Sequence, residues 1–287
     1  MDEITKMAFL LTILAGLSTG IGSLIALFLK NNKNTNYLAF AMSFAAGVML
    51  FVSFAEIFPH AIEELEAIYE SRAEAAGDSS DDPGHFGHIM ATICFFIGMG
   101  LVWLIEKLIP SAEDIQTGEM ELDANGMPIN KKKLMRIGIL SAIALALHNF
   151  PEGIATFTAA MDNMHLGVTI AIAIALHNIP EGIAVSMPIY YATGSKAKAF
   201  FYSFLSGLVE PLGAIVVFLF FGDQMQEEGS IFMPAMLAGV AGIMVFISLE
   251  QLLPTSKEYG KTKLSTYGLI AGMVIMALSL LIVPHSH

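Results

Sequence analysis

The chain contains eight apolar blocks of about 20 residues or slightly more, and this pattern limits its fold more strongly than any other feature. A helix of roughly 20 residues spans the hydrocarbon core of a bilayer, which is about 30 Å thick. We therefore predict an all-α polytopic membrane protein with eight transmembrane helices, forming one transmembrane domain over residues 1–287. The expected helices cover residues 7–29, 37–60, 88–109, 137–160, 166–190, 199–221, 231–253 and 264–284.

Composition excludes several classes of protein. Charged residues make up 14% of the chain, well below the roughly 25% of soluble domains, and this excludes a soluble globular fold. The 26 acidic and 14 basic residues give a net charge of −12, which would repel a nucleic acid. The single cysteine, Cys94, permits no internal disulfide and no cysteine-based zinc or iron–sulfur site.

The basic residues indicate how the chain crosses the membrane. Twelve of the 14 lysines and arginines fall in one alternate set of loops, and only Lys6 and Arg72 fall in the other. Because cytoplasmic loops carry the excess of lysine and arginine, the first set faces the cytoplasm and both termini lie outside. We expect a multi-pass protein of the cell membrane (inner or plasma membrane) with a cytoplasmic loop at about 110–136.

Two segments of the chain repeat almost unchanged. Residues 144–155 read ALALHNFPEGIA and residues 173–184 read AIALHNIPEGIA, with ten of twelve positions identical. They lie in the fourth and fifth blocks, which run in opposite directions. A weaker match relates residues 45–59 to residues 240–254, with six of fifteen positions identical, in the second and seventh blocks. These matches predict a 3+2+3 inverted-repeat arrangement, in which two three-helix bundles flank a central antiparallel pair, as in secondary transporters.

The repeated motif gathers polar side chains in the middle of the membrane. His148 and Glu152 are four residues apart and therefore share one helix face, and His177 and Glu181 repeat this spacing. Each histidine, like Glu210, is the twelfth residue of its block, near the bilayer midplane, where an ionised carboxylate is costly. No lysine or arginine lies near the middle of any block, so a bound cation is the expected partner. The candidate metal-site residues are His148, Asn149, Glu152, His177, Asn178, Glu181 and Glu210.

The types of ligand narrow the choice of ion. Imidazole, amide oxygen and carboxylate suit Zn²⁺, Fe²⁺, Mn²⁺, Co²⁺ or Cd²⁺, whereas the lack of thiolates disfavours Cu(I). Histidine argues against Mg²⁺ or Ca²⁺ as the main substrate. Seven ligands exceed what one four-coordinate ion needs, and a two-ion site bridged by Glu152 and Glu181 would use them. The metal is the transported substrate, and we expect no cofactor.

The motifs HNFPEG (148–153), HNIPEG (177–182) and SGLVE, which ends at Glu210, resemble those of the ZIP metal transporters, in particular the bacterial ZupT-type branch. The resemblance covers the whole chain and implies import of divalent metal into the cytoplasm. It also implies one metal position formed by Glu152, His177 and Glu181, with His148 adjoining. The neighbouring position would use Asn149, Glu152, Asn178, Glu181 and Glu210. Residues 110–136 contain no histidine, unlike the histidine-rich loop of many relatives.

Two other interpretations stay open. A membrane-embedded di-metal hydrolase could use the same ligands to activate water, although the zinc-protease signature HExxH is absent and we expect no enzyme. A passive metal channel is the other. The expected partners are divalent metal ions and the lipid bilayer, with a homodimer as a further option. Seven further residues are secondary candidate ligands, and ordinary roles at helix ends or on the surface are equally open to them: Glu56, His60, Glu250, His85, His88, His285 and His287.

Overall fold

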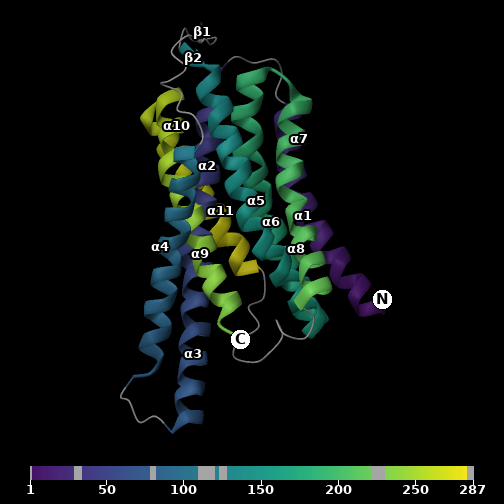
Figure 1. The fold of residues 1–287 in the computed structure, drawn as a ribbon. Coiled ribbons are helices and arrows are strands. Elements are labelled where there is room, and N and C mark those ends of the chain that lie inside the picture. Colours follow the sequence, from purple (N-terminus) through teal and green to yellow (C-terminus); the bar gives the residue numbers. More distant parts are fainter. Residues whose placement is uncertain are drawn as a thin grey trace.

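The computed structural model describes residues 2–28, 34–77, 82–108, 120–122, 128–221 and 230–282. Within these ranges it contains eight helical stretches long and apolar enough to cross a membrane, which confirms the predicted all-α polytopic fold. The helices run side by side along the long axis of the molecule, and α3 extends beyond the others at one end (Figure 1). The helices are α1 (Glu3–Phe28), α2 (Thr35–Val52), α3 (Phe58–Ala76), α4 (Gly84–Leu108), α5 (Lys131–Asp162), α6 (Met164–Thr193), α7 (Lys196–Gly207), α8 (Val209–Val216), α9 (Phe232–Ile247), α10 (Leu253–Tyr259) and α11 (Thr262–Ile282).

Several helices are longer than the apolar blocks that predict them. The second span continues through α3 to Ala76, and α5 begins at Lys131 rather than at residue 137. The added turns are polar, so they lie outside the apolar pattern from which the boundaries were read. The side chain of Asn130 starts α5 by accepting a hydrogen bond from the Lys133 backbone N–H at 3.0 Å.

The expected cytoplasmic loop contains a short hairpin that the sequence did not predict. Strands β1 (Met120–Leu122) and β2 (Pro128–Asn130) pair antiparallel, with Glu121 opposite Ile129. Ile129 is buried in the main apolar cluster, and the hydroxyl of Tyr259 accepts a 3.3 Å hydrogen bond from the backbone N–H of Asn130. These contacts hold β2 against α10. Residues 109–119 and 123–127 of this loop lie outside the described residues.

Two helices contain a turn of π-helix at matching places in the weak repeat. These turns, η1 (Ser53–Ile57) and η4 (Ser248–Leu252), each begin at a serine and are each followed two residues later by a proline. The serine hydroxyls donate to the carbonyl oxygens four residues earlier, at 2.6 Å for Ser53 and 2.8 Å for Ser248. Proline lacks an N–H and crowds the preceding turn, which a wider turn accommodates. The inverted repeat itself stays a prediction.

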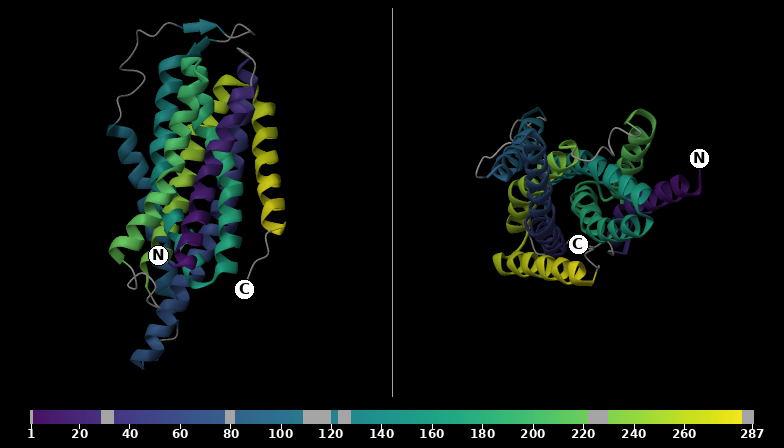
Figure 2. Two further views of the ribbon diagram at one scale, coloured as in Figure 1. Left: turned by 90° about the vertical axis from the view of Figure 1, so that its right-hand side faces the viewer. Right: turned by 90° about the horizontal axis from the view of Figure 1, so that it is seen from below.

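The helices pack in two groups that differ from the expected three-helix bundles. One group contains α1, α5, α6, α7 and α8, and the other contains α2, α3, α4, α9, α10 and α11. The first span therefore packs with the fourth, fifth and sixth, and Figure 2 shows α8 and α11 on opposite sides of the molecule. The expectation that spans 1–3 form one bundle and spans 6–8 another was wrong, because sequence order does not fix which helices become neighbours.

Glycines bring helices within each group into backbone contact. A Cβ added at Gly22 or Gly182 would overlap the backbone of the other helix of the α1–α6 pair, and Gly98 and Gly242 do the same for α4 and α9. Such close approach is typical of helix packing in membranes. The two groups meet through larger side chains, including Met49, Leu145 and Met244 in the main apolar cluster.

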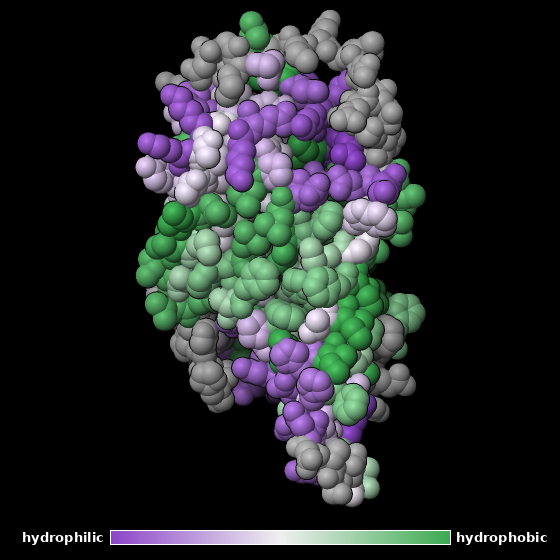
Figure 3. Space-filling model, turned by 90° about the vertical axis from the view of Figure 1, so that its left-hand side faces the viewer, coloured by the Kyte–Doolittle hydropathy of each residue, from purple (hydrophilic) through white to green (hydrophobic). Residues whose placement is uncertain are grey.

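The surface has the polarity expected of a membrane protein. Hydrophobic residues form a band around the middle of the molecule, and hydrophilic residues gather at both ends (Figure 3). At the end that carries β2, Arg136 of α5 lies 3.5 Å from Glu106 of α4, and Gln251 of η4 donates to the same carboxylate at 2.8 Å. The chain is a multi-pass membrane protein, and this polar contact links its two helix groups.

Candidate metal centre

The repeated motif lies on α5 and α6, which form an antiparallel hairpin. Asn163 separates the two helices, and its side chain accepts hydrogen bonds from the backbone N–H groups of His165 and Leu166 at 2.9 and 3.3 Å. Because the connection is so short, residues at similar distances from Asn163 lie near one another across the pair. Both helices continue through the prolines of the motif, Pro151 and Pro180.

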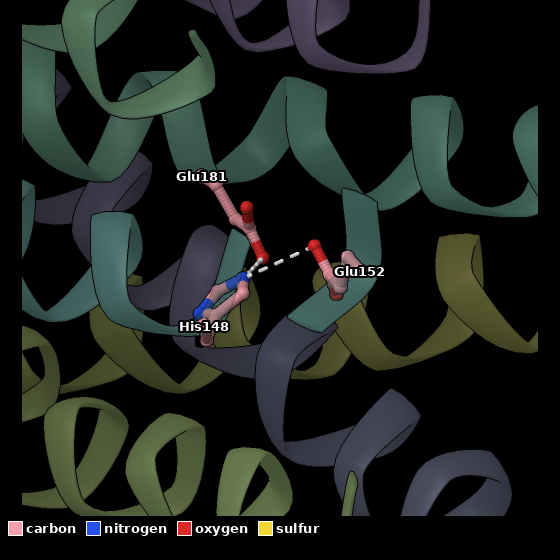
Figure 4. Close-up of side chains that lie close together, drawn as sticks. All are labelled: His148, Glu152 and Glu181. Carbon is pink, nitrogen blue, oxygen red and sulfur yellow. Dashed lines mark ion pairs between the residues drawn. The ribbon is translucent and has the colours of Figure 1, made fainter. Parts of the chain in front are cut away.

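The histidines and glutamates of the two motifs pair across this hairpin. His148 Nε2 lies 2.9 Å from Glu181 Oε1 and 3.6 Å from Glu152 Oε2, and these three side chains point toward one another (Figure 4). His177 Nε2 lies 2.9 Å from the other carboxylate oxygen of Glu152. All four side chains are buried, with Glu152 3% exposed and His177 5% exposed.

One group of three potential ligands is compact enough to hold a metal ion. One ligand atom from each of His148, Glu152 and Glu181 lies within 4.8 Å of the others. Ligands that surround one zinc ion tetrahedrally at about 2.0–2.2 Å are about 3.3–3.6 Å apart, so small side-chain movements would let all three ligand atoms bind one ion. Nitrogen and oxygen donors of this kind suit zinc and other divalent transition metals.

The remaining three predicted ligands lie where α5 and α6 meet α1, α7 and α8: Asn149 on α5, Asn178 on α6 and Glu210 on α8. Asn178 Nδ2 donates to the Ala15 carbonyl oxygen at 3.0 Å and to Glu210 Oε1 at 2.5 Å. Asn149 Nδ2 donates to the carbonyl oxygen of Ser206 at 3.1 Å. Among the described residues, the Oδ1 atoms of both asparagines and the Oε2 atom of Glu210 find no hydrogen-bond partner, although they are buried. Three buried oxygen acceptors without donors form an environment that favours a cation.

Close packing places Glu210 beside α5. A Cβ at Gly153, next to Glu152, would overlap the backbone carbonyl of Glu210, so these residues touch through their main chains. Gly213, one turn further along α8, makes the same kind of contact with the carbonyl of Phe150. The glycine of the motif HNFPEG thus allows the third carboxylate to approach the other two.

Comparison with known proteins identifies the family. The sequence model described as ZIP Zinc transporter matches residues 4–133 and 117–280. The chain belongs to this ZIP family. Three proteins named zinc transporter ZupT are similar to this chain in sequence over nearly its whole length. The one from Clostridium perfringens is 46% identical over 96% of this chain and 95% of its own length. Those from Streptococcus mutans and Chlorobium phaeovibrioides are 49% and 50% identical, each over 96% of this chain and 97% of the relative.

In this ZIP protein, His148 belongs to the compact group, and His177 contacts that group through Glu152. The division of the ligands between two metal positions that the resemblance implied stays a prediction. The carbonyl oxygens of Ala15 and Ser206, which orient the two asparagines, were not predicted. A backbone carbonyl leaves no mark in the sequence, so no signal could have identified them.

The secondary candidates that the structure describes lie on elements other than α5, α6 and α8. His60 pairs with Glu64 at 3.2 Å and His88 pairs with Glu66 at 3.1 Å, both near the end of the molecule that carries α3. Glu56 and Glu250 lie in the two π-helical turns. His285 and His287 lie outside the described residues. A transport role for any of these side chains stays a prediction.

Proposed function

We propose that this chain imports divalent transition metal ions into the cytoplasm, with Zn²⁺ as the first choice and Fe²⁺, Mn²⁺, Co²⁺ and Cd²⁺ as further substrates. The observation that carries the proposal is the buried group of His148, Glu152 and Glu181 on two facing membrane helices. Buried carboxylates in a membrane segment mark ion pathways, and their ligand set suits zinc. Membership of the ZIP family and the names of the relatives support the same function.

The proposed site holds two ions. The first is bound by His148, Glu152, His177 and Glu181, and the second is bound by Asn149, Asn178 and Glu210 with help from the bridging carboxylates Glu152 and Glu181. The paired histidines and glutamates support the first position, and the unpartnered oxygens of the asparagines and Glu210 support the second.

The proposed orientation has both termini outside the cytoplasm. It rests on the distribution of basic residues, with Lys133 and Arg136 at the cytoplasmic end of α5. Metal import then runs from the end of the molecule that carries α3, where the outer loops hold most of the acidic residues, toward the end that carries β2. A single domain over residues 1–287 and a homodimer are further proposals.

Transport into proteoliposomes that contain only this protein tests the function. The proposal predicts saturable accumulation of ⁶⁵Zn²⁺, and loss of this accumulation in Glu181→Ala at equal protein content. A rate that rises in proportion to zinc concentration without saturation would instead favour a passive channel. Normal uptake by Glu181→Ala would show that the site is elsewhere.

A further inference from the structure

The polar contacts between the two helix groups lie at the end of the molecule that carries β2, opposite the end that carries α3 (Figure 1). Four pairs of residues make these contacts: Arg136 and Glu106, Lys133 and Glu258, Tyr191 and Asn34, and Asn130 and Tyr259. At the opposite end, no hydrogen bond or ion pair between residues that the structure describes joins the two groups. The contact there between His88 and Glu66, for example, stays within the group of α3 and α4.

The main apolar contact between the groups lies on the same side of the metal centre. The main apolar cluster contains Met49 and Met244 of one group and side chains of α5 and α6 of the other. Its buried members from α5 all precede His148, and those from α6 all follow Glu181, so they lie between the metal centre and the end that carries β2. The seven candidate ligands are at most 5% exposed. An ion bound among them therefore leaves toward this end only after the two groups separate there.

Glu106 of α4 is held from both helix groups. Arg136 of α5 donates through Nη2 to the backbone carbonyl oxygen of Glu106 at 3.2 Å, and its Nη1 atom lies 3.5 Å from Glu106 Oε1. Gln251, which belongs to the same group as Glu106, donates to this Oε1 atom at 2.8 Å. The side chains of Glu106 and Arg136 are each 20% exposed, whereas those of Lys133 and Glu258 are 41% and 42% exposed. Solvent therefore weakens the contact at Glu106 less than it weakens the more exposed pair.

The π-helical turn η4 provides the third member of this contact. Leu249 and Glu250 of this turn are exposed, whereas Gln251 is buried. A π-helical turn inside an α-helix is rare and is frequently found at a functional site. Here the turn contains a buried amide that contacts a carboxylate which the other helix group also contacts.

We infer that Glu106, Arg136 and Gln251 form a latch, which holds the two helix groups together at the end that carries β2 and opens when the metal ion leaves for the cytoplasm. This inference rests on the proposed function, because it assigns release of the transported ion to this end. A secondary transporter exposes a central site to one side of the membrane at a time by moving one bundle against the other. Arg136 and Glu106 belong to different groups, so their contact breaks when the groups separate here, whereas Gln251 stays with Glu106.

Changes of charge in the latch test this role. Glu106→Gln removes the negative charge with little change in size. Glu106→Arg and Arg136→Glu each place two like charges side by side, and the combination of both restores an ion pair with the charges exchanged. Glu64→Arg is the matched control, because Glu64 pairs with His60 of its own helix and does not join the two groups.

Two cysteine substitutions, each introduced into a chain with Cys94→Ala, report where the protein opens. Ala144→Cys places a thiol in the main apolar cluster, one helical turn from His148 on the side of β2. Ala8→Cys places a thiol on the other side of the metal centre, in the apolar cluster of α1, α5 and α8. The measurement is the rate at which each thiol reacts with a water-soluble maleimide, in full-length protein held in lipid nanodiscs that leave both faces open to the reagent.

We expect Glu106→Gln and Arg136→Glu to raise the reaction rate at position 144 about tenfold, the effect of losing a hydrogen bond to a charged group, and to leave the rate at position 8 unchanged. The combined charge exchange is expected to lower the rate at position 144 again, and Glu64→Arg to resemble the wild type. An unchanged rate at position 144 in Glu106→Gln would overturn the inference. A combined variant that reacts as fast as Arg136→Glu alone would also overturn it.

The second reporter distinguishes a latch from a general contribution to folding. A purely structural role for Glu106 predicts equal increases of the reaction rate at positions 144 and 8, because the whole fold would loosen, and this result would overturn the inference. Failure of the wild type to accumulate zinc in proteoliposomes would reject the proposed function. In that case the reaction rates, which do not depend on transport, still decide whether these residues keep this end of the molecule closed.

Discussion

His148 of α5 pairs with Glu181 of α6, and His177 of α6 pairs with Glu152 of α5, each with a nitrogen–oxygen distance of 2.9 Å. Each histidine thus lies against the glutamate of the other copy of the motif. Neither copy provides a complete binding site alone, because the compact ligand group takes two side chains from α5 and one from α6. The antiparallel hairpin therefore builds one site from two nearly identical sequences.

This reciprocal pairing predicts a strong effect of shortening Glu181. Glu181→Asp keeps the charge but withdraws the carboxylate by one methylene, about 1.5 Å, and so removes it from reach of His148. We expect at least tenfold weaker apparent affinity for zinc in proteoliposome uptake, because metal ligands tolerate only small displacements. Glu64→Asp is the control, since Glu64 is exposed and pairs with His60 away from the site. Equal kinetics in the two variants would contradict the assignment of Glu181.

The close contact between α5 and α8 predicts a second effect. Gly153→Ala would place a methyl group against the backbone carbonyl of Glu210 and force the two helices apart. We expect a loss of zinc uptake and a destabilisation of about 1–3 kcal/mol, the usual range for inserting a methyl group into a packed interior.

Gly100→Ala is the matched control for this experiment. A Cβ at Gly100 of α4 would meet no atom within 4 Å, so the variant is expected to be as stable as the wild type or slightly more stable. Uptake and thermal unfolding of both variants are the measurements. If Gly153→Ala behaves like Gly100→Ala, the contact does not position Glu210.

The parts of this fold that could be predicted are those that depend only on the pattern of neighbouring residues in the sequence. Eight apolar blocks are enough to predict eight spans, and the spacing of His148 and Glu152 places both on one helix face whatever the surrounding structure. The polar first turn of α5, which begins at Lys131, has no such signal and was predicted as loop. The helix groups could not be predicted either, because the packing of α1 on α6 depends on contacts between distant parts of the chain.

The same distinction applies within the candidate site. The sequence named seven side chains, and the structure places them on facing helices in two adjoining sets. The sequence did not show that each histidine lies against the glutamate of the opposite motif. This pairing depends on the register of α5 and α6 around Asn163.

Acidity is expected to weaken uptake. Histidine binds a metal ion only when its imidazole is neutral, and glutamate binds only when ionised, so protons compete with zinc for the free site. With a reference histidine pKa of about 6.5, the half-saturating zinc concentration should rise as the outer pH falls from about 7.5 to about 5.5. Initial rates of ⁶⁵Zn²⁺ uptake at several zinc concentrations measure this. A half-saturating concentration that does not change over this range would count against ligation by His148 and His177.

The last prediction concerns the number of ions. Glu152, Glu181 and Glu210 carry three negative charges when ionised, and one divalent ion compensates only two of them. Carboxylates held this close together are costly to ionise without further cations. A second divalent ion bound by Glu210 and the amide oxygens of Asn149 and Asn178 would give the unpartnered oxygens of this region a partner.

Crystals soaked in Cd²⁺ should therefore show two anomalous scattering peaks about 3.5–4 Å apart, the spacing common in two-metal sites. Glu210→Ala is expected to keep the peak beside His148 and to lose or weaken the peak beside Asn178, because Glu210 accepts a hydrogen bond from Asn178 and is not part of the group formed by His148, Glu152 and Glu181. Zinc uptake by this variant should fall, while one ion per molecule still binds. A single peak at saturating metal, unaffected by Glu210→Ala, would reject the second ion and leave the position formed by His148, Glu152 and Glu181 as the transport site.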